Sequence, residues 1–363
     1  MTTTPTPVTA HVPPPATAPH PAVRPDPLPR GGGPSLSFAA TVNRALVHRD
    51  ALGEVFVTDL RRRGDAHYAA AAQFPRSHAY FGDHLLRPRT HDTILLLETA
   101  RQATLAGAHE FFGIPAQDKF ILTFLRVRID QPSLLALGST PLELELDITV
   151  TDQRVRAGRV VGLDHAIRFL VDGVAVGHAG VGLRFRDPAG YREMRLRTRG
   201  GAPLPTTASL DPKGSAAAPH LVGRTDPENV VLLSPVAHDG TAEAELLVPA
   251  RHPSMFDHPQ DHLPGMVLAE AARQLAHFTA LSSGFASGSA LALAELNVTF
   301  AKFGELEPAT VLTAVPGPRQ PAGVELESTT AGTALALLPV TVEALQDGEP
   351  IARFSLSLAH ISG

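Results

Sequence analysis

The stretch Leu97-Glu98-Thr99-Ala100-Arg101-Gln102 has a counterpart later in the chain, Ala269-Glu270-Ala271-Ala272-Arg273-Gln274. Both copies read E-x-A-R-Q inside an otherwise apolar stretch, and they lie 172 residues apart (270 − 98). The same offset aligns Phe124-Leu125-Arg126 with Leu296-Asn297-Val298 without a gap. A segment that repeats over this length predicts two copies of one fold in the chain.

Each copy is predicted to hold one long apolar helix followed by strands. The first helix covers 93–112 and ends at Gly113 and Pro115, which are helix stop signals. The second covers 265–281. The predicted strands are 54–59, 66–73, 120–129, 142–151, 159–171 and 174–186 in the first half, and 230–236, 243–248, 291–300, 310–316, 323–331, 334–344 and 350–358 in the second.

A helix that is apolar nearly all round and is followed by antiparallel strands indicates an α+β unit in which the sheet wraps the helix. This is the hotdog pattern, and its repetition predicts a double hotdog. We expect hotdog domains at 36–195 and 228–363, with a Pro-, Gly- and Ala-containing linker at 196–227. Residues 1–35 are rich in Pro, Thr and Ala, and we expect a disordered tail there.

Composition excludes several classes of function. The 363 residues include no cysteine, which removes disulfides, thiol nucleophiles and cysteine-bound zinc. A net charge of −5 gives no electrostatic case for nucleic acid. We find no apolar run long enough for a membrane span and no secretory signal, so we expect a cytoplasmic protein. No G-x-S-x-G, P-loop or G-x-G-x-x-G motif is present, and no cofactor is expected.

The charged positions of the two helices are the candidate catalytic residues. Glu98 and Arg101, like Glu270 and Arg273, are three residues apart and share one helical face. On a solvent-exposed face such a pair contributes only a few tenths of a kcal/mol. Here the neighbours are apolar, and burying a charge costs several kcal/mol unless it is well paired. This setting favours function, with a purely structural ion pair as the alternative.

Four further residues are candidates for binding substrate. Gln102 and Gln274 follow the arginines, where their amides face either the neighbouring strand or a ligand carbonyl. His84 and His258 lie in the loops before the helices, among other imidazoles and carboxylates. No His or Asp spacing in these loops rises above chance as a metal site, so no metal is expected.

The stretch 257–271, D-H-P-Q-D-H-L-P-G-M-V-L-A-E-A, is similar to the helix entry P-G-[MV]-[LV]-x-x-E-A of hotdog enzymes such as β-hydroxyacyl-ACP dehydratases. In those enzymes a loop histidine and the helix glutamate form the catalytic pair. His258 lies twelve residues before Glu270 (270 − 258), and His84 lies fourteen before Glu98 (98 − 84). With the E-x-A-R-Q copies and Phe81-Gly82-Asp83-His84, the chain from about 46 to 358 resembles the A-factor biosynthesis (AfsA) family of γ-butyrolactone synthases.

The resemblance implies that a β-ketoacyl group passes from an acyl carrier protein to the hydroxyl of dihydroxyacetone phosphate. The ester phosphate then closes by aldol chemistry to a butenolide phosphate, a precursor of butyrolactone, butenolide or furan signals. Glu98 or Glu270, with a pKa raised by apolar surroundings, suits the base that takes the hydroxyl proton. Arg101 or Arg273 suits the clamp on the phosphate. The apolar helix face would line an acyl tunnel.

Three questions stay open at the level of sequence. A hotdog dehydratase or thioesterase, and a non-catalytic module that binds an acyl chain or lactone, remain alternative functions. Either repeat, or both, is a candidate for the active copy. We expect the two repeats to pair within one chain as a pseudo-dimer, and the whole molecule to be a monomer or a homodimer.

Overall fold

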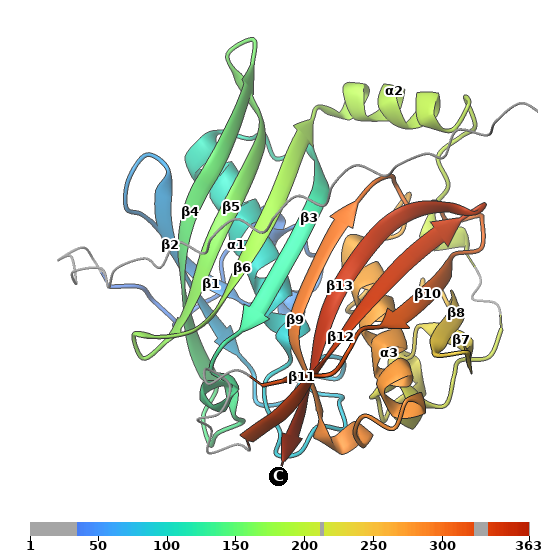
Figure 1. The fold of residues 1–363 in the computed structure, drawn as a ribbon. Helices are drawn as coiled ribbons and strands as arrows, with labels where there is room; N and C mark the ends of the chain where they lie inside the picture. Colours follow the sequence, from blue (N-terminus) through green and yellow to red (C-terminus); the bar gives the residue numbers. More distant parts are fainter. Residues whose placement is uncertain (1–34, 211–213, 323–332, 363) are drawn as a thin grey trace, which may run out of the picture. The chain divides into compact units, whose positions relative to one another are not determined.

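One antiparallel sheet runs through the whole folded unit (Figure 1). A computed structural model describes residues 35–210, 214–322 and 333–362. The sheet has 13 strands in the order β1-β2-β4-β5-β6-β3-β9-β13-β12-β10-β8-β7, with the short β11 beside β12. Helices α1 (Thr93–Phe112) and α3 (Gly265–Ser282) lie against the same face of this sheet.

Of the described strands, six come from the first half of the chain and seven from the second. The first half supplies β1 (Val57–Arg62), β2 (His67–Phe74), β3 (Lys119–Ile129), β4 (Leu142–Arg156), β5 (Arg159–Val171) and β6 (Val174–Arg186). The second supplies β7 (Leu232–His238), β8 (Thr241–Leu246), β9 (Leu291–Phe300), β10 (Val311–Pro316), β11 (Gln320–Pro321), β12 (Thr333–Gln346) and β13 (Glu349–Ser362). A third helix, α2 (Pro188–Thr198), follows β6. The predicted double hotdog, an α+β fold, is what the structure has.

The two halves are joined by antiparallel pairing of β3 with β9. Leu125 pairs with Val298, and Arg126 pairs with Asn297. The sequence repeat makes Leu125 equivalent to Asn297 and Arg126 equivalent to Val298, so each pair exchanges the two copies. That is the geometry of a twofold axis, and the interface resembles that of a symmetric dimer.

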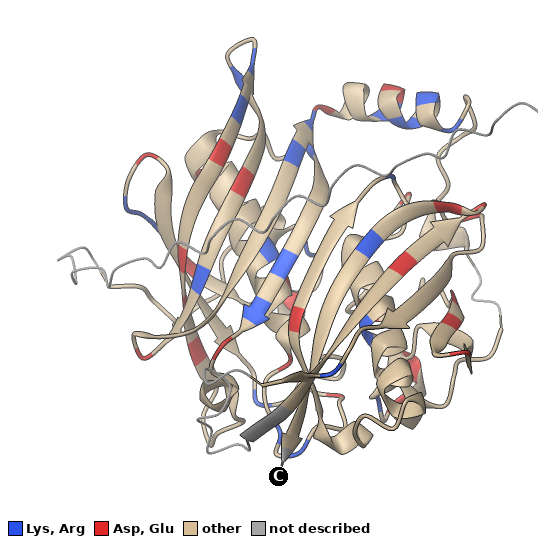
Figure 2. Ribbon diagram, in the orientation of Figure 1, with Lys and Arg blue, Asp and Glu red and all other residues tan. Residues whose placement is uncertain are grey.

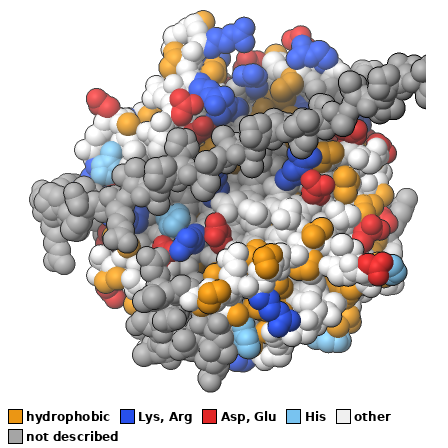
Figure 3. Space-filling view, viewed as in Figure 1, with side chains coloured by type: hydrophobic (Ala, Val, Ile, Leu, Met, Phe, Trp, Pro, Cys, Tyr) orange, Lys and Arg blue, Asp and Glu red, His pale blue; other side chains and the backbone are white. Residues whose placement is uncertain are grey.

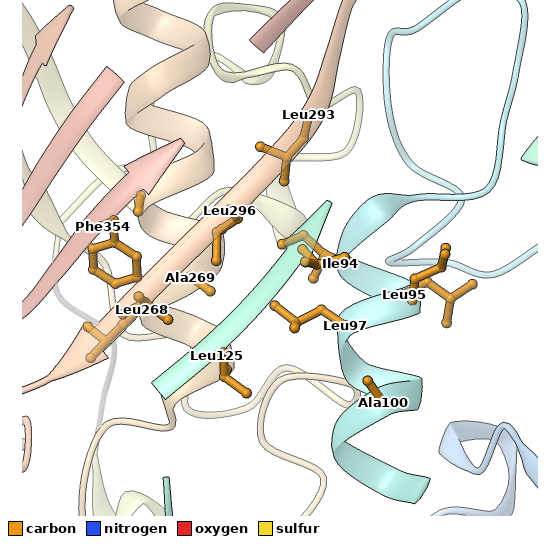
Figure 4. Close-up of a cluster of buried hydrophobic side chains, with 14 of the residues drawn as sticks. Ile94, Leu95, Leu97, Ala100, Leu125, Leu268, Ala269, Leu293, Leu296 and Phe354 are labelled. Carbon is orange, nitrogen blue, oxygen red and sulfur yellow. The ribbon is translucent and has the colours of Figure 1, made fainter. Parts of the chain in front are cut away.

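The two long helices are buried because their apolar residues cover most of the circumference. Residues 93–100 of α1 and 267–280 of α3 are buried throughout. Figure 4 shows Leu97 of α1 and Leu268 of α3 on either side of Leu125 from β3 and Leu296 from β9. Asp92 begins α1 by accepting a hydrogen bond from the N–H of Ile94 at 2.9 Å, and Gly113 ends it with φ +65°. One continuous core therefore spans both repeats.

Charged residues occur along the strands of the sheet (Figure 2). In β4, Leu144, Leu146 and Ile148 are buried while Glu143 and Glu145 are exposed, as the alternation of the sequence predicts. In Figure 3, charged and hydrophobic side chains are mixed over the coloured part of this view. The surface visible in this view is therefore mixed, while α1 and α3 lie against one face of the sheet.

The observed elements differ from the predicted ones in several places. Strands β4 and β13 extend to Arg156 and Ser362, beyond their predicted ends, and the short β11 was not predicted. Strand β1 begins at Val57, because Leu52–Glu54 form a 3₁₀ turn. Helix α2 was not predicted. The predicted linker, 196–227, contains 3₁₀ turns at Thr207–Ser209 and Pro219–Val222, and a further one, Pro227–Asn229, begins at its last residue. The predicted strand 323–331 and, except for Ser35, the predicted tail 1–35 lie outside the described residues. The domain boundaries stay a prediction.

Among the described residues, no helix is long and apolar enough to cross a membrane.

Candidate active site

The carboxylate of Glu98 is the centre of the first charged cluster. It accepts hydrogen bonds from Arg101 Nε and Nη2, both at 2.7 Å, and from Arg49 Nη2 at 2.7 Å. The Nε2 of Gln102 donates a further bond at 2.9 Å. The side chain of Glu98 is 1% exposed, so the predicted apolar setting of the charge is confirmed.

Glu270 is the centre of an equivalent cluster in the second repeat. It accepts hydrogen bonds from Arg273 Nη2 at 2.6 Å, from Arg224 Nη2 at 2.8 Å and from Gln274 Nε2 at 2.6 Å. The side chains of Glu270 and Arg224 have no exposed surface, and that of Arg273 is 3% exposed. Each repeat thus places two arginines on one buried carboxylate.

The expected rise in the pKa of Glu98 and Glu270 is wrong. Burial by itself raises the pKa of Glu98, but the charges and hydrogen bonds of Arg101 and Arg49 outweigh it and lower the pKa to about 2. Burial acts in the same way on Glu270, and Arg224 and Arg273 again lower its pKa to about 2. Both carboxylates are therefore ionised at neutral pH and are poor proton acceptors.

The two glutamines bind the protein chain itself. Gln102 accepts from the N–H of Phe56 at 3.0 Å and donates to the carbonyl of Glu54 at 2.7 Å. Gln274 makes the same contacts with Val231 and Asn229, at 2.9 and 2.7 Å. Both amides are fully buried and bond to backbone groups of a neighbouring segment. This is the first of the two expected roles, contact with the neighbouring strand, and it leaves no amide atom for the second, a ligand carbonyl.

Arg49 and Arg224 are the site residues that sequence reasoning missed. Each follows a 3₁₀ turn, Arg44–Val47 or Pro219–Val222, and they are 175 residues apart (224 − 49). The stretches Arg49-Asp50-Ala51-Leu52-Gly53-Glu54-Val55 and Arg224-Thr225-Asp226-Pro227-Glu228-Asn229-Val230 share only Arg and Val at equivalent positions. The match of Arg and Val at an offset of 175, close to the 172 of the helices, was the one sequence signal that could have found these arginines.

The two arginines also tie each cluster to the loop of the other repeat. Arg49 Nη1 donates to the carbonyl of Ser254 at 3.1 Å, and Asp257 accepts from the N–H of Asp50 at 2.8 Å. Arg224 Nη1 donates to the carbonyl of Tyr80 at 2.8 Å. The loop before each helix therefore lies against the helix of the other copy.

This exchange sets the positions of the two predicted histidines. His258 lines the same cavity as Glu98, and its Nδ1 lies 2.6 Å from Asp257. His84 lies with Arg273 in a different cavity, and its Nε2 lies 2.9 Å from the carbonyl of Thr90. The pairs that follow one another in sequence, His258 with Glu270 and His84 with Glu98, do not share a cavity.

The cluster around Glu98 opens into a large cavity of about 1640 Å³. Arg101 is 13% and Arg49 is 9% exposed, so guanidinium surface faces this space. The cavity is lined by residues of both repeats and by α2. Its lining combines polar and charged side chains with apolar ones, among them Leu105, Phe120, Leu122, Leu183, Leu263, Met266, Phe300 and Ile351.

The cluster around Glu270 is closed. The neighbouring cavity holds only about 70 Å³. Tyr80 donates its hydroxyl to Glu270 at 3.2 Å and stacks on Arg224, whose guanidinium carbon is 4.6 Å from the ring centre. The equivalent of Tyr80 at the offset of the loops (252 − 78 = 174) is Ser254, which leaves the first cluster uncovered. His277, at the position of Leu105, fills further space beside Arg273.

No group of three or more His, Asp or Glu side chains within the described ranges is arranged to hold a metal ion.

The chain is similar to known proteins in family, sequence and fold. The model of the A-factor biosynthesis hotdog domain matches residues 34–186 and 206–362. A 2-oxo-3-(phosphooxy)propyl 3-oxoalkanoate synthase of Streptomyces virginiae is 35% identical over 240 residues, which cover 65% of this chain and 76% of the relative. A synthase of the same name from Streptomyces griseus is 36% identical over 249 residues, 66% of this chain and 75% of the relative.

A solved pyran synthase domain from module nine of the sorangicin pathway is 15% identical, covers 85% of this chain and 98% of its own, and has a TM-score of 0.49. A likeness of that size carries no argument about function. The family match covers both copies of the repeat, from before the first cluster to the last strand. The chain belongs to the A-factor biosynthesis hotdog (AfsA) family.

Proposed function

We propose that this protein is a 2-oxo-3-(phosphooxy)propyl 3-oxoalkanoate synthase, and that it works in the cavity beside Glu98. It transfers a β-ketoacyl group from an acyl carrier protein thioester to the hydroxyl of dihydroxyacetone phosphate. The family and the relatives' printed activity support the reaction. The observation that supports the place is the contrast between about 1640 Å³ beside Glu98 and about 70 Å³ beside Arg273.

The apolar part of the large cavity suits an acyl chain. Leu122, Phe300 and Ile351 come from strands of both repeats and line it together. Apolar surface of this kind binds an alkyl chain mainly by removing both surfaces from water, at about 25 cal/mol per Å². The β-ketoacyl chain therefore extends away from the charged cluster in this proposal.

The charged part of the cavity suits the phosphate. Arg101 uses Nε and Nη2 to bind Glu98, and among the described residues no hydrogen bond uses its Nη1. Lys119, at the start of β3, lines the same cavity and makes no ion pair with any described residue. A guanidinium and an ammonium group that face one open space form a binding site for a dianion.

Glu98 has a supporting part in this proposal. Its low pKa keeps the carboxylate ionised, so Glu98 offsets the charge of Arg49 and orients Arg101 by accepting its hydrogen bonds. Glu270, Arg273 and Arg224 form the matching closed cluster, which acts as a scaffold for the exchanged loops. The active copy is the first.

The acyl carrier protein as partner and a cytoplasmic location belong to the same proposal, because both substrates are products of cytoplasmic metabolism. The ester phosphate would cyclise to a butenolide phosphate by intramolecular aldol condensation.

The purified chain should convert a β-ketoacyl-acyl carrier protein and dihydroxyacetone phosphate to the ester phosphate or its butenolide, detected by mass spectrometry with release of the carrier thiol. Release of free acid without the phosphate substrate would show a thioesterase instead. Loss or addition of water on the acyl chain would show a dehydratase. Tight binding of a finished lactone without turnover would show a binding module.

A further inference from the structure

His48 has a backbone conformation that side chains with a Cβ rarely adopt. It follows the first 3₁₀ turn, with φ +54° and ψ +51°, in the left-handed region. The residue before the partner arginine of the other repeat is Gly223, with φ +79°. The same backbone turn is therefore made with glycine in the closed cluster and with a histidine in the open one. Glycine at position 48 would remove the backbone strain. The presence of histidine there indicates that its side chain has a use.

A chain of two hydrogen bonds determines which nitrogen of His48 carries the proton. His109 Nδ1 lies 2.8 Å from the carbonyl oxygen of Ile114, and a carbonyl only accepts, so this nitrogen is the N–H of the neutral ring. His109 Nε2 is then an acceptor, and it lies 2.9 Å from His48 Nε2. His48 Nε2 must donate this bond. In neutral His48 the free lone pair is consequently on Nδ1.

Nδ1 of His48 is an exposed atom of a residue that lines the large cavity. His48 lines that cavity, and among the described residues no hydrogen bond reaches its Nδ1. If Nδ1 were buried, it would be a buried polar atom without a hydrogen-bond partner. It is not one of these atoms within the described ranges, so it has exposed surface. Phe120 packs edge-on against the ring, with centroids 4.7 Å apart, and holds its plane.

Two cationic side chains act on His48, Arg101 from α1 and Lys119 from β3. The imidazoles of His109 and His258 are also near it, and the carboxylates of Glu98 and Asp257 line the same cavity. Burial and then the positive charges lower the pKa of His48 to about 3. The ring is therefore neutral at pH 7, with its lone pair free.

We propose that His48 Nδ1 is the base that takes the proton from the hydroxyl of dihydroxyacetone phosphate. This assignment rests on the proposed function and deepens it. As the proton moves to Nδ1, the hydroxyl oxygen bonds to the thioester carbonyl carbon. The tetrahedral intermediate then expels the carrier sulfur, which takes the proton back from Nδ1 and leaves as a thiol. The ester forms, the thioester breaks, and His48 returns to its neutral state.

The phosphate of the substrate makes His48 a stronger base. Burial is the largest cause of its low pKa, and a dianion bound between Arg101 and Lys119 offsets the second cause, the charges of these two side chains. His109 accepts from Nε2–H throughout and stabilises the imidazolium that forms, so His109 is a positioning residue. Proton transfer is thus favoured only when the phosphate substrate is in place, which protects the thioester from water.

The closed cluster lacks the whole arrangement. Gly223 stands in place of His48, and Leu281 stands at the position equivalent to His109 (109 + 172). Within the described part of the chain, Glu270 therefore has no counterpart of the His48–His109 pair, which agrees with the assignment of the reaction to the first cluster.

His48→Gly is the sharpest test, because glycine suits the left-handed backbone and should leave the fold intact. We expect kcat to fall about 10²-fold or more, the usual contribution of a general base, with little change in KM for dihydroxyacetone phosphate. Added imidazole should fill the space left and restore part of the rate in a saturable way. His109→Leu, which copies Leu281, should lower kcat less and should not respond to imidazole. His277→Leu, a histidine outside the open cluster, is the matched control and should keep kcat.

The outcomes separate the two proposals. If wild type forms no ester phosphate, the proposed function is wrong and the base assignment falls with it. If wild type is active and His48→Gly keeps its kcat, the base assignment alone is wrong. A loss confined to KM, without imidazole rescue, would also overturn it and make His48 a phosphate-binding group. Circular dichroism and the melting temperature of His48→Gly confirm that the variant is folded.

Discussion

The guanidinium of Arg49 lies 2.7 Å from the carboxylate of Glu98, a residue 49 positions further along the chain. This contact changes the chemistry of Glu98, because a second arginine lowers the pKa that burial would otherwise raise. A carboxylate held between two guanidiniums stabilises positive charge and has little use as a base. Four predictions follow from this arrangement and its counterpart in the second repeat.

Glu270→Gln should destabilise the protein by about 3–5 kcal/mol, because it leaves Arg224 and Arg273 buried with no counter-charge. Glu98→Gln should cost less, since Arg101 and Arg49 retain some exposed surface and water can solvate them. Urea unfolding followed by circular dichroism measures both free energies. Equal losses, or a loss below about 1 kcal/mol for Glu270→Gln, would contradict the difference in burial of the clusters.

Arg101→Gln should raise KM for dihydroxyacetone phosphate about ten- to hundredfold, the usual range for removing a charge-assisted hydrogen bond of about 1.5–3 kcal/mol. Arg273→Gln is the matched variant from the closed cluster. It should lower stability while leaving KM of the folded fraction unchanged. Steady-state kinetics with the phosphate substrate varied distinguishes the two, and a KM effect of Arg273→Gln would move the site to the second repeat.

Acid should destabilise the protein in two stages. Burial, and then the charge of Arg273, lowers the pKa of His277 to about 3. Below pH 6.5 the imidazole therefore binds a proton in the unfolded chain and stays neutral in the folded one. Stability is therefore lost as pH falls from about 7 towards 3. Glu98 and Glu270, with pKa values of about 2 against 4.5 unfolded, contribute stability above about pH 5 that is lost as pH falls towards 2.

His277→Leu tests the first stage, since Leu105 occupies the equivalent place in the other repeat. The loss of unfolding free energy between pH 8 and pH 5 should be about 2 kcal/mol smaller in the variant than in wild type. Unfolding curves at the two pH values measure it. An unchanged pH dependence would mean that His277 is protonated in the folded state.

Leu122→Phe should shift the preference towards shorter acyl chains. Leu122 lines the large cavity and lies near Phe300, since a Cβ added at Gly265 would approach both side chains. The larger ring narrows the apolar part of the space, and each methylene that no longer fits changes specificity by about 10–200-fold. Competition between β-ketoacyl thioesters of different length, read by mass spectrometry, gives the ratio. An unaltered ratio would place the chain elsewhere in the cavity.

The helices and most strands followed from local patterns. The apolar stretch with Gly113 after it gives α1 its observed bounds, and the alternation around Leu144 gives β4 its buried face. Helix α2 was missed because only Tyr191 and Arg195 of its residues are buried, so it has no apolar periodicity to read. Its sequence signal was the cap Asp187 followed by proline, which is weak on its own.

The charged helix positions were found because a charged residue that recurs in an apolar stretch can be recognised in the sequence. Their partners were not, since Arg49 and Arg224 lie outside the helices in short turns with little shared sequence. The exchange of the loops was also missed, because the helix entry at 257–271 is similar to one in which a loop histidine pairs with the glutamate of the helix that follows it. In space, His258 shares the cavity of Glu98.

The sequence by itself determined the duplication, the α+β double hotdog and the burial of two charged tetrads, because helix and strand periodicity and a constant offset are local properties of the chain. Only the tertiary structure decided which arginines complete the cluster around each glutamate and which loop covers it. The same structure decided that the cluster around Glu98 is open while Tyr80 and His277 close the one around Glu270. It also decided the direction of the glutamate pKa values. That direction depends on how many cations lie within a few ångströms of a buried carboxylate, and those cations come from distant parts of the chain.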